Sequence, residues 1–250
     1  MGYIGTRLKF FHKIRSMYSY QLELLETAAP PQHGDVLVAA FQSAGRGMGN
    51  NKWESEADKN LLTSFFLKPQ KLDAEKQFYL NMAVSLSVCH TVKHYIKSSS
   101  VTIKWPNDIY VGKRKIAGIL ISHTVIGSMI SYTIAGIGIN VNQGRFLSDA
   151  PNPVSLIHHL ERESDIKECL QVLLDEMNRY YPMVIAGRFV ELHQHYISVL
   201  YGFAQWRYYI YRDEKIKAKI KQVLPFGQLE LVTADNRLLR CNFKEIEFLM

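Results

Sequence analysis

The chain contains a glycine-rich segment, residues 42–53, whose residue types could bind an anion. Gly45 and Gly47 flank Arg46 there, directly after a short apolar run. Glycine allows close approach of the backbone, so successive N–H groups can converge on a phosphate while the Arg46 guanidinium supplies a permanent positive charge. The segment is not a P-loop, because no Gly-Lys-Ser/Thr closes it. Taken alone, it is equally compatible with a flexible surface loop.

A second segment places charged residues at the ends of two short strands. Residues 104–108 read Lys-Trp-Pro-Asn-Asp, and Lys115 opens the apolar run 116–120. A lysine that enters an apolar strand needs a partner or a function, since an unpaired buried charge is costly. The alternative is a β-turn at 106–108 with Lys115 protecting an edge strand.

A third segment, residues 134–142, has glycines at alternate positions of a strand. Because Gly136 and Gly138 point to the same face of the strand, that face has no side chains at these positions. A flat ligand or a tightly crossing sheet could contact the backbone there. A third glycine and a following helix are missing, so the pattern is not a dinucleotide-binding fingerprint.

The periodicity of apolar residues predicts the elements that must position these segments. Alternating or continuous apolar runs predict strands at 36–41, 61–67, 101–104, 109–111, 115–124 and 130–140. Spacings of three and four residues predict helices over 75–97 and 165–189, and a weaker one over 15–28. From residue 205, alternation of Ile216, Ala218 and Ile220 with lysines predicts a separate small β domain.

Composition excludes several classes of protein. With 47% hydrophobic and 21% charged residues, the 250-residue chain is neither disordered nor collagen-like. Its net charge of +7 permits nucleic acid, an anionic membrane or a negatively charged small ligand. The longest nearly uncharged stretch, 116–142, is too interrupted to span a membrane. Three cysteines, Cys89, Cys169 and Cys241, indicate reduced core thiols in a cytosolic protein.

Together, in this order and spacing, the segments resemble the biotin protein ligase family, the biotin-[acetyl-CoA-carboxylase] ligases, over nearly the whole chain. The residues that carry the resemblance are Gly45-Arg46-Gly47, Trp53-Glu54-Ser55, Asn60-Leu61, Lys104-Trp105-Pro106-Asn107-Asp108, Lys115-Ile116-Ala117-Gly118-Ile119-Leu120 and Gly136-Ile137-Gly138-Ile139-Asn140.

The resemblance implies an α+β fold, in which helices cover a mixed or antiparallel sheet of the class II synthetase-like type over residues 1–202. A small SH3-like β-barrel follows at 203–250. It also implies a cytoplasmic ligase that uses ATP and Mg²⁺ to activate biotin as biotinyl-5'-AMP. The biotin then passes to a lysine of a biotin carboxyl carrier protein or domain. Magnesium is expected to be bound through ATP, with no metal site on the protein.

The resemblance also assigns roles to residues. Lys115 is expected between the biotin carboxyl group and the α-phosphate, Arg46 at the same phosphoryl group, and Asp108 beside Lys115 or the incoming acceptor lysine. The implied biotin-binding residues are Ser16, Gln42, Gly45, Arg46, Lys115, Gly118, Gly136 and Gly138. The implied adenylate-binding residues are Arg46, Trp53, Lys115 and Asn140, and the implied acceptor-facing residues are Lys104, Asn107 and Asp108.

Two departures from the family pattern stand out. Where members carry Asp-Ser-Thr-Asn, this chain has Arg-Ser-Met-Tyr at 15–18, so Ser16 or its rival Ser19 is left to contact the biotin ureido group. Where members carry Gly-Arg-Gly-Arg-Arg-Gly, Met48 and Gly49 replace both later arginines. We therefore expect a looser lid that leaks the adenylate.

Expectations about partners remain partly open. The motif at Ser16 lies near the start of the sequence, so a monofunctional enzyme without an N-terminal DNA-binding domain, and with neither nucleic acid nor membrane as partner, is expected. A homodimer through a sheet edge is one arrangement, with residues 127–139 as the candidate edge strand. A lipoate ligase or octanoyltransferase, or a non-catalytic biotin sensor or nucleic-acid-binding regulator, are the alternative functions.

Overall fold

The computed structural model describes residues 2–47, 49, 52–148 and 152–249. A seven-stranded sheet has the strand order β1-β2-β3-β7-β6-β5-β4. Its strands are β1 (Arg7–Ile14), β2 (Asp35–Gln42), β3 (Asn60–Leu67), β4 (Val101–Lys104), β5 (Asp108–Val111), β6 (Arg114–Ile126) and β7 (Met129–Asn140). Only β1 and β2 pair in parallel, while the other neighbours are antiparallel. The predicted mixed sheet of an α+β fold is therefore confirmed.

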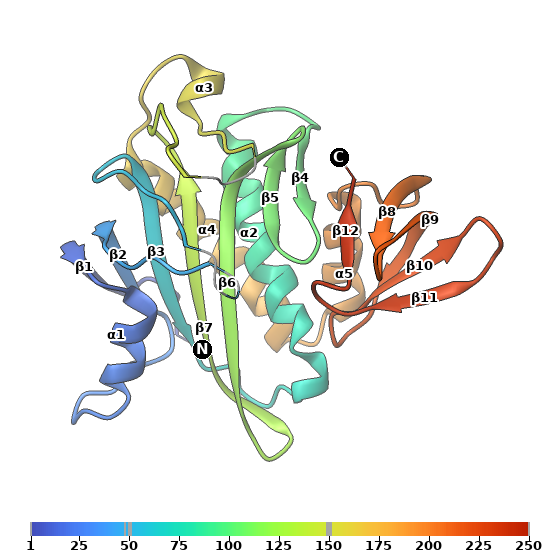
Figure 1. Ribbon diagram of the computed structural model, residues 1–250. Coiled ribbons are helices and arrows are strands. Elements are labelled where there is room, and N and C mark those ends of the chain that lie inside the picture. The colour runs from blue at the N-terminus through green and yellow to red at the C-terminus, as the bar shows by residue number, and fades with distance from the viewer. Residues whose placement is uncertain (1, 48, 50–51, 149–151, 250) are drawn as a thin grey trace.

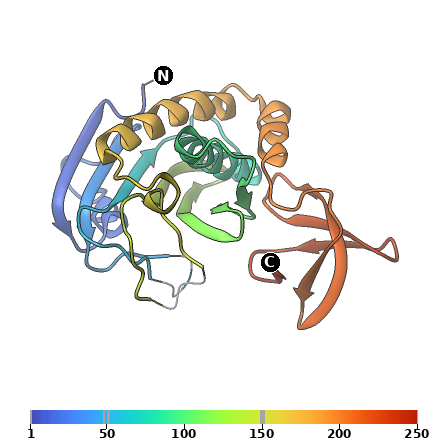
Figure 2. The same ribbon diagram turned by 90° about the horizontal axis from the view of Figure 1, so that it is seen from above.

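Helices cover one face of this sheet, as the views in Figures 1 and 2 show. The long helices are α2 (Phe78–Tyr95), α4 (Ile166–Ile185) and α5 (Phe189–Ser198), with a short α3 (Ile157–Leu160) and the 3-10 turn η1 (Ala74–Lys76). Helix α2 is buried along most of its length, as expected of a helix that is apolar on nearly every side. On β3, Leu61 and Phe65 point into the core beneath these helices.

On the opposite face of the sheet, α1 (Met17–Leu24) is the one helix among the described residues, which leaves room for a site. Because strand side chains alternate between faces, Leu62 points away from the main core and packs with Met17 and Leu37. The weak apolar period over 15–28 thus forms a short helix that packs on this second face. Most of the open face lies beside α1, over β6 and β7 (Figure 1).

A second sheet of five antiparallel strands follows, with the order β11-β10-β9-β8-β12. Its strands are β8 (Arg207–Tyr211), β9 (Glu214–Val223), β10 (Leu229–Thr233), β11 (Leu238–Cys241) and β12 (Ile246–Phe248). On β9, Ala218 and Ile220 are buried while Lys217 and Lys221 are exposed, as the alternation predicts. The division into domains at residue 202 stays a prediction.

One prediction about the sheet is wrong. We expected residues 127–139 to supply an edge strand, but β7 pairs with β3 on one side and with β6 on the other. From Thr133 to Asn140 the strand is buried at nearly every position, on both faces, as is typical of a strand in the interior of a sheet. The edges are β1 and β4, and β1 escaped prediction because its sequence has no clear alternation and it is mostly exposed.

Two expectations from composition concern the described residues. Among them, no helix combines the length and apolar character that crossing a membrane requires. The three cysteines, Cys89, Cys169 and Cys241, are free and buried, as predicted for core thiols. Burial raises the pKa of the Cys89 and Cys169 thiols to about 12, so both stay protonated at neutral pH.

Candidate active site

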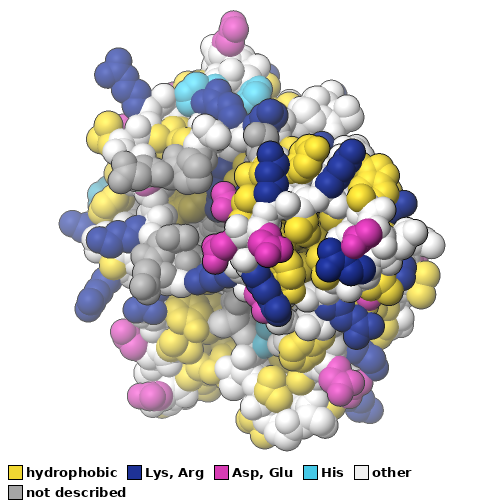
Figure 3. Space-filling view, turned by 45° about the vertical axis from the view of Figure 1, so that its right-hand side comes forward, with side chains coloured by type: hydrophobic (Ala, Val, Ile, Leu, Met, Phe, Trp, Pro, Cys, Tyr) yellow, Lys and Arg dark blue, Asp and Glu magenta, His cyan; other side chains and the backbone are white. Residues whose placement is uncertain are grey.

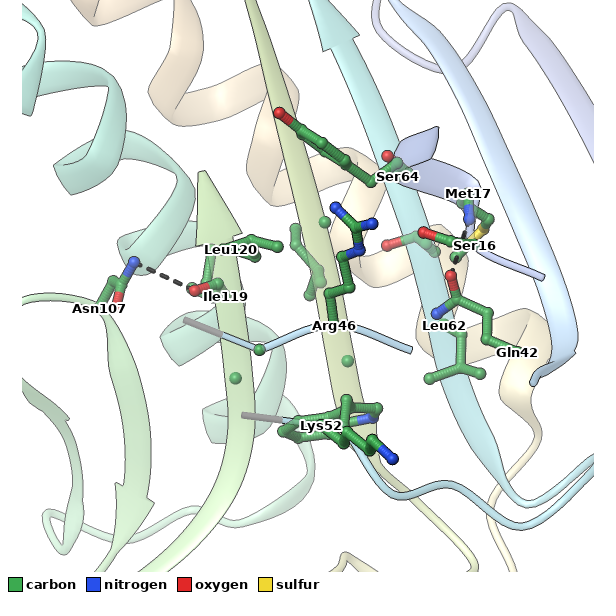
Figure 4. A pocket seen from close by; sticks show the side chains of 18 of the residues that line it. Ser16, Met17, Gln42, Arg46, Lys52, Leu62, Ser64, Asn107, Ile119 and Leu120 are labelled. Carbon is green, nitrogen blue, oxygen red and sulfur yellow. Dashed lines mark hydrogen bonds between the residues drawn. The ribbon is translucent and has the colours of Figure 1, made fainter. Parts of the chain in front are cut away.

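A cavity of about 160 Å³ lies on the face of the larger sheet that carries α1. Its lining combines the start of α1, the end of β2, the glycine-rich segment, and parts of β3, β6 and β7 (Figure 4). The predicted residues that reach this lining are Ser16, Gln42, Arg46, Trp53, Asn107, Asp108, Lys115, Gly118, Gly136 and Gly138. Ten residues from segments far apart in the sequence are therefore brought to one cavity.

An ion pair links two of the predicted catalytic residues. Lys115 Nζ on β6 lies 2.7 Å from Asp108 Oδ2 on β5, and the side chains are 28% and 31% exposed. The backbone of Lys115 is fixed as well, because its N–H donates to Asn152 O and its carbonyl accepts from Val154 N, both at 2.9 Å. The lysine that seemed out of place in an apolar strand therefore has a partner and faces the cavity.

The glycine-rich segment folds back on itself across the cavity. Arg46 and Lys52 form an isolated antiparallel bridge, and Trp53 N donates to Gly45 O at 3.1 Å. A β-carbon on Gly45 would lie 3.0 Å from Trp53 O, so glycine is needed for this close return of the chain. Arg46 points over the strands of the sheet in Figure 4. The hypothesis of a leaky lid concerns Met48, which lies outside the described residues.

The side chain of Trp53 occupies part of the glycine wall. A β-carbon on Gly138 would lie 2.5 Å from Trp53 Cε2, and one on Gly118 would lie 2.6 Å from Trp53 Cζ3. A β-carbon on Gly136 would meet nothing closer than Leu120 O at 3.7 Å. Two of the three predicted glycines thus make room for an indole, and Gly136 alone leaves its face free for a ligand.

The start of α1 brings polar groups to the opposite side of the cavity. Ser16 caps the helix, with its Oγ accepting from Ser19 N at 3.4 Å, and Gln42 Oε1 accepts from Met17 N at 2.9 Å. Of the two rival serines, Ser16 lies on the lining and Ser19 does not. The hydroxyl of Ser16 is therefore the one placed to meet a ligand.

Sequence reasoning missed lining residues on β3, notably Thr63 and Ser64. Ser64 Oγ donates to Gln21 Oε1 at 2.7 Å, whereas Thr63 Oγ1 is buried and, among the described residues, has no hydrogen-bond partner. Two consecutive polar residues inside an otherwise apolar run were the signal that could have found them.

Three predicted site residues do not reach the lining, namely Gly45, Lys104 and Asn140. Lys104 Nζ lies 5.2 Å from the ring centroid of Tyr110 and 5.6 Å from that of Phe248, and burial lowers the pKa of Lys104 although Asp108 opposes that shift. Asn140 is buried and donates to Val154 O at 3.0 Å. Their predicted roles rest on the resemblance alone.

The segment after β7 is tied to the glycine-rich segment through Glu54. The Glu54 carboxylate accepts from Leu147 N at 2.7 Å and from Ser148 N at 2.8 Å. Burial opposes ionisation of Glu54, but these hydrogen bonds outweigh it and lower the pKa of the carboxyl group. Throughout the described part of the chain, no three His, Cys, Asp or Glu side chains gather as a metal site would require.

Comparison with known proteins gives a consistent result. Residues 14–140 match the sequence profile of the biotin/lipoate A/B protein ligase family. The bifunctional ligase/repressor BirA of Escherichia coli is 31% identical over 122 residues, which cover 49% of this chain and 37% of that protein. Biotin–protein ligase 1 of Arabidopsis thaliana is 35% identical over 117 residues, which cover 45% and 31%. The chain thus spans less than half the length of these relatives.

Solved structures match along nearly the whole chain. The biotin protein ligase of Aquifex aeolicus in complex with biotin and ATP has a TM-score of 0.79 at 24% identity, covering 97% of this chain and 98% of that one. The ligase of Leishmania major in complex with biotinyl-5-AMP has a TM-score of 0.63 at 20% identity, covering 95% and 99%. At these identities the likeness establishes the fold, including the second antiparallel sheet.

Proposed function

Because the chain belongs to the biotin/lipoate A/B protein ligase family, we propose that it is a biotin protein ligase. It joins biotin to ATP to form biotinyl-5'-AMP and transfers the biotin to a lysine of a carboxyl carrier protein or domain. The observation that carries this proposal is the Lys115–Asp108 ion pair, which lies on one cavity with Arg46 and the glycine-rich segment. Mg²⁺ enters with ATP, and the protein acts in the cytoplasm.

In the first step, a biotin carboxylate oxygen attacks the α-phosphorus of ATP. A phosphorus–oxygen bond forms, the bond to the bridging oxygen breaks, and pyrophosphate leaves with that electron pair. Two anions about 4 Å apart repel by about 4 kcal/mol at an effective dielectric constant of 20. Lys115 and Arg46 are cations on the cavity lining that offset this repulsion, and Lys115, which Asp108 holds in place, does so without reorganising.

In the second step, the amine of the acceptor lysine attacks the carbonyl carbon of the adenylate. An amide bond forms, AMP leaves, and the amine loses a proton. Asp108 is the carboxylate on the lining that can orient this amine, since it already holds the ammonium of Lys115 at 2.7 Å. Asn107 stabilises the turn next to it by donating to Ile119 O at 3.2 Å.

Biotin binds between the start of α1 and the glycine wall. Ser16 and Gln42 supply polar groups on one side, and the bare face of Gly136 lies on the other. Trp53 packs on Gly118 and Gly138 of this wall, and its ring centroid lies 6.0 Å from Lys115 Nζ. The indole therefore forms a wall shared by biotin and adenylate.

The test is the exchange of labelled pyrophosphate into ATP, measured separately with biotin, lipoate and octanoate. We expect exchange that depends on biotin. Exchange with lipoate or octanoate in place of biotin would show a different acyl substrate. Binding of biotin without any exchange would show a sensor and contradict the proposed enzyme.

A further inference from the structure

Helix α1 carries a buried glutamine on the side that packs on the sheet. The buried residues of α1 are Met17 and Gln21, one helical turn apart, and Gln21 is 1% exposed. A polar side chain that is shielded from water in this way is costly unless it is hydrogen-bonded. Gln21 bonds Ser64 of β3 twice: its Oε1 accepts from Ser64 Oγ at 2.7 Å, and its Nε2 donates to Ser64 O at 3.4 Å. The buried amide is thus tied to one residue of the cavity lining.

These two bonds fix the direction of the Ser64 hydroxyl. The amide nitrogen of Gln21 can only donate, and it lies at the Ser64 carbonyl oxygen, so the amide oxygen is the atom that faces Ser64 Oγ. Because an amide oxygen only accepts, the one proton of the hydroxyl is used in this bond. The lone pairs of Ser64 Oγ remain, and among the described residues no group donates to them. Ser64 therefore offers the cavity an acceptor and no donor.

Ser64 lies beside the part of the cavity wall that is open to a ligand. In the pairing of β3 with β7 it is opposite Gly136, and both residues line the cavity. Gly136 is the glycine whose face Trp53 leaves free. Figure 4 shows Ser64 close to the start of α1, where Ser16 lies. Directly opposite residues of an antiparallel pair have β-carbons about 5 Å apart, so a flat ring that covers Gly136 has its edge within reach of Ser64 Oγ.

Charge does not distinguish one uncharged ring from another. The cations on the cavity lining are Arg46, Lys52 and Lys115, which attract carboxylates and phosphates. Other Lys and Arg side chains are spread among hydrophobic ones on the side of the molecule that Figure 3 brings forward. Selection among rings must therefore come from hydrogen bonds and shape, and Ser64 supplies a directed hydrogen bond.

We propose that Ser64 accepts a hydrogen bond from a ring N–H of the substrate, and that Gln21 is the positioning residue that directs the hydroxyl proton away from the ligand. This inference rests on the proposed function and names the group of biotin that is recognised at this position. The cyclic urea of biotin has two N–H donors, whereas the dithiolane ring of lipoate and the alkyl chain of octanoate have none. A site that is built for a donor rejects a ligand without one, because its buried acceptor is then left unpaired.

The experiment compares biotin with two carbamate analogues, in each of which an oxygen atom replaces one of the two ureido N–H groups. Pyrophosphate exchange at saturating ATP gives the KM for each ligand. In the unchanged protein, one analogue should have a KM about tenfold or more above that of biotin, because its ring oxygen faces the lone pairs of Ser64. In Ser64→Ala, the KM for biotin should rise about tenfold with little change in kcat, and the preference over that analogue should largely disappear.

Gln21→Leu separates positioning from a structural role. Without the amide oxygen, the hydroxyl of Ser64 can rotate and donate to the ring oxygen of the analogue, so the preference for biotin should weaken about fivefold. In a Ser64→Ala background the same substitution should change neither KM, and this double variant leaves no unpaired amide in the core. The matched controls off the cavity lining are Gln171→Leu, exposed on α4, and Ser85→Ala, buried on α2.

Three outcomes would overturn the inference. The first is a KM for both analogues within about twofold of that for biotin in the unchanged protein. The second is an undiminished preference for biotin in Ser64→Ala. The third is a rise in KM by the same factor for biotin and analogue in Gln21→Leu, which is the mark of a purely structural role. Absence of exchange with biotin in the unchanged protein would refute the proposed function instead, so the two failures are distinguishable.

Discussion

Lys115 combines two properties that usually exclude each other, a charged side chain and a place in an apolar strand. The ion pair with Asp108 stabilises the ammonium, while hydrogen bonds to the backbone of residues 152 and 154 fix its position. A cation held in this way does not need to reorganise when two anions approach. Its position in the sequence was enough to single it out, because the strand 116–120 around it is apolar.

The first prediction concerns this lysine. Lys115→Ala should reduce biotin-dependent pyrophosphate exchange by about 100-fold or more, because only Arg46 is then left to offset the repulsion between carboxylate and phosphate. Lys113→Ala is the control, since Lys113 is exposed in the turn two residues earlier and lies off the cavity lining. Exchange that survives in Lys115→Ala would remove Lys115 from the mechanism.

Among the elements, β6 and β7 show how a strand can be shaped by a residue far away in the sequence. The sequence predicted that Gly118, Gly136 and Gly138 form a wall, but not that Trp53 covers two of them. Spacing shows which side chains are missing from a strand, whereas the group that fills the space is decided by tertiary packing. For the same physical reason, β1 and the true edges of the sheet could not be predicted, while the central strands could.

The second prediction tests this packing. Gly138→Ala should lower the free energy of unfolding by about 1–3 kcal/mol, because the new methyl group collides with the indole ring of Trp53. Gly136→Ala should change it little, since its β-carbon has ordinary space. Urea unfolding followed by tryptophan fluorescence measures both. Equal stabilities of the two variants would contradict the packing that the structure shows.

The third prediction concerns His123, which links three elements. One ring nitrogen bonds Thr133 of β7 at 2.9 Å and the other Asn81 of α2 at 3.0 Å, and burial lowers the pKa of His123 to about 4. Since that pKa lies below the ordinary 6.5, protonation favours the unfolded chain. The contribution of His123 to the free energy of unfolding is therefore fully present above pH 6.5. It falls by about 3 kcal/mol as the pH drops from 6.5 to 4.

Urea unfolding at pH 7.5 and pH 5 measures this loss. His123→Gln should be less stable at pH 7.5 but should lose less stability on acidification than the unchanged protein. Part of the loss must remain, because burial also lowers the pKa of His90 to about 4. An unchanged pH dependence in His123→Gln would assign the effect to other groups.

At the scale of the whole molecule, the two sheets meet through a small set of aromatic side chains. Phe243 of the second sheet packs on Trp105 and Phe78, and Trp105 donates to Gly227 O. Composition and periodicity indicated two sheets, but they carried no information on how the sheets pack.

The fourth prediction concerns this interface. Phe243→Ala should destabilise the protein by about 2 kcal/mol, less than the 3–5 kcal/mol of a fully buried phenylalanine because Phe243 is 42% exposed. Phe226→Ala is the control, at 55% exposure on the β9–β10 turn. Calorimetry measures both variants, and equal destabilisation by the two substitutions would contradict the role of Phe243 between the sheets.

The pairing of β3 with β7 has a consequence for biosynthesis. Leu62 of β3 pairs with Gly138 of β7, and both residues line the cavity. The two strands are far apart in the sequence, so β3 is synthesised well before β7. Contacts of such long sequence separation form late and slowly. A nascent chain that ends before β7 therefore exposes the apolar β3 without its neighbour, and its cavity stays incomplete until that strand has been translated.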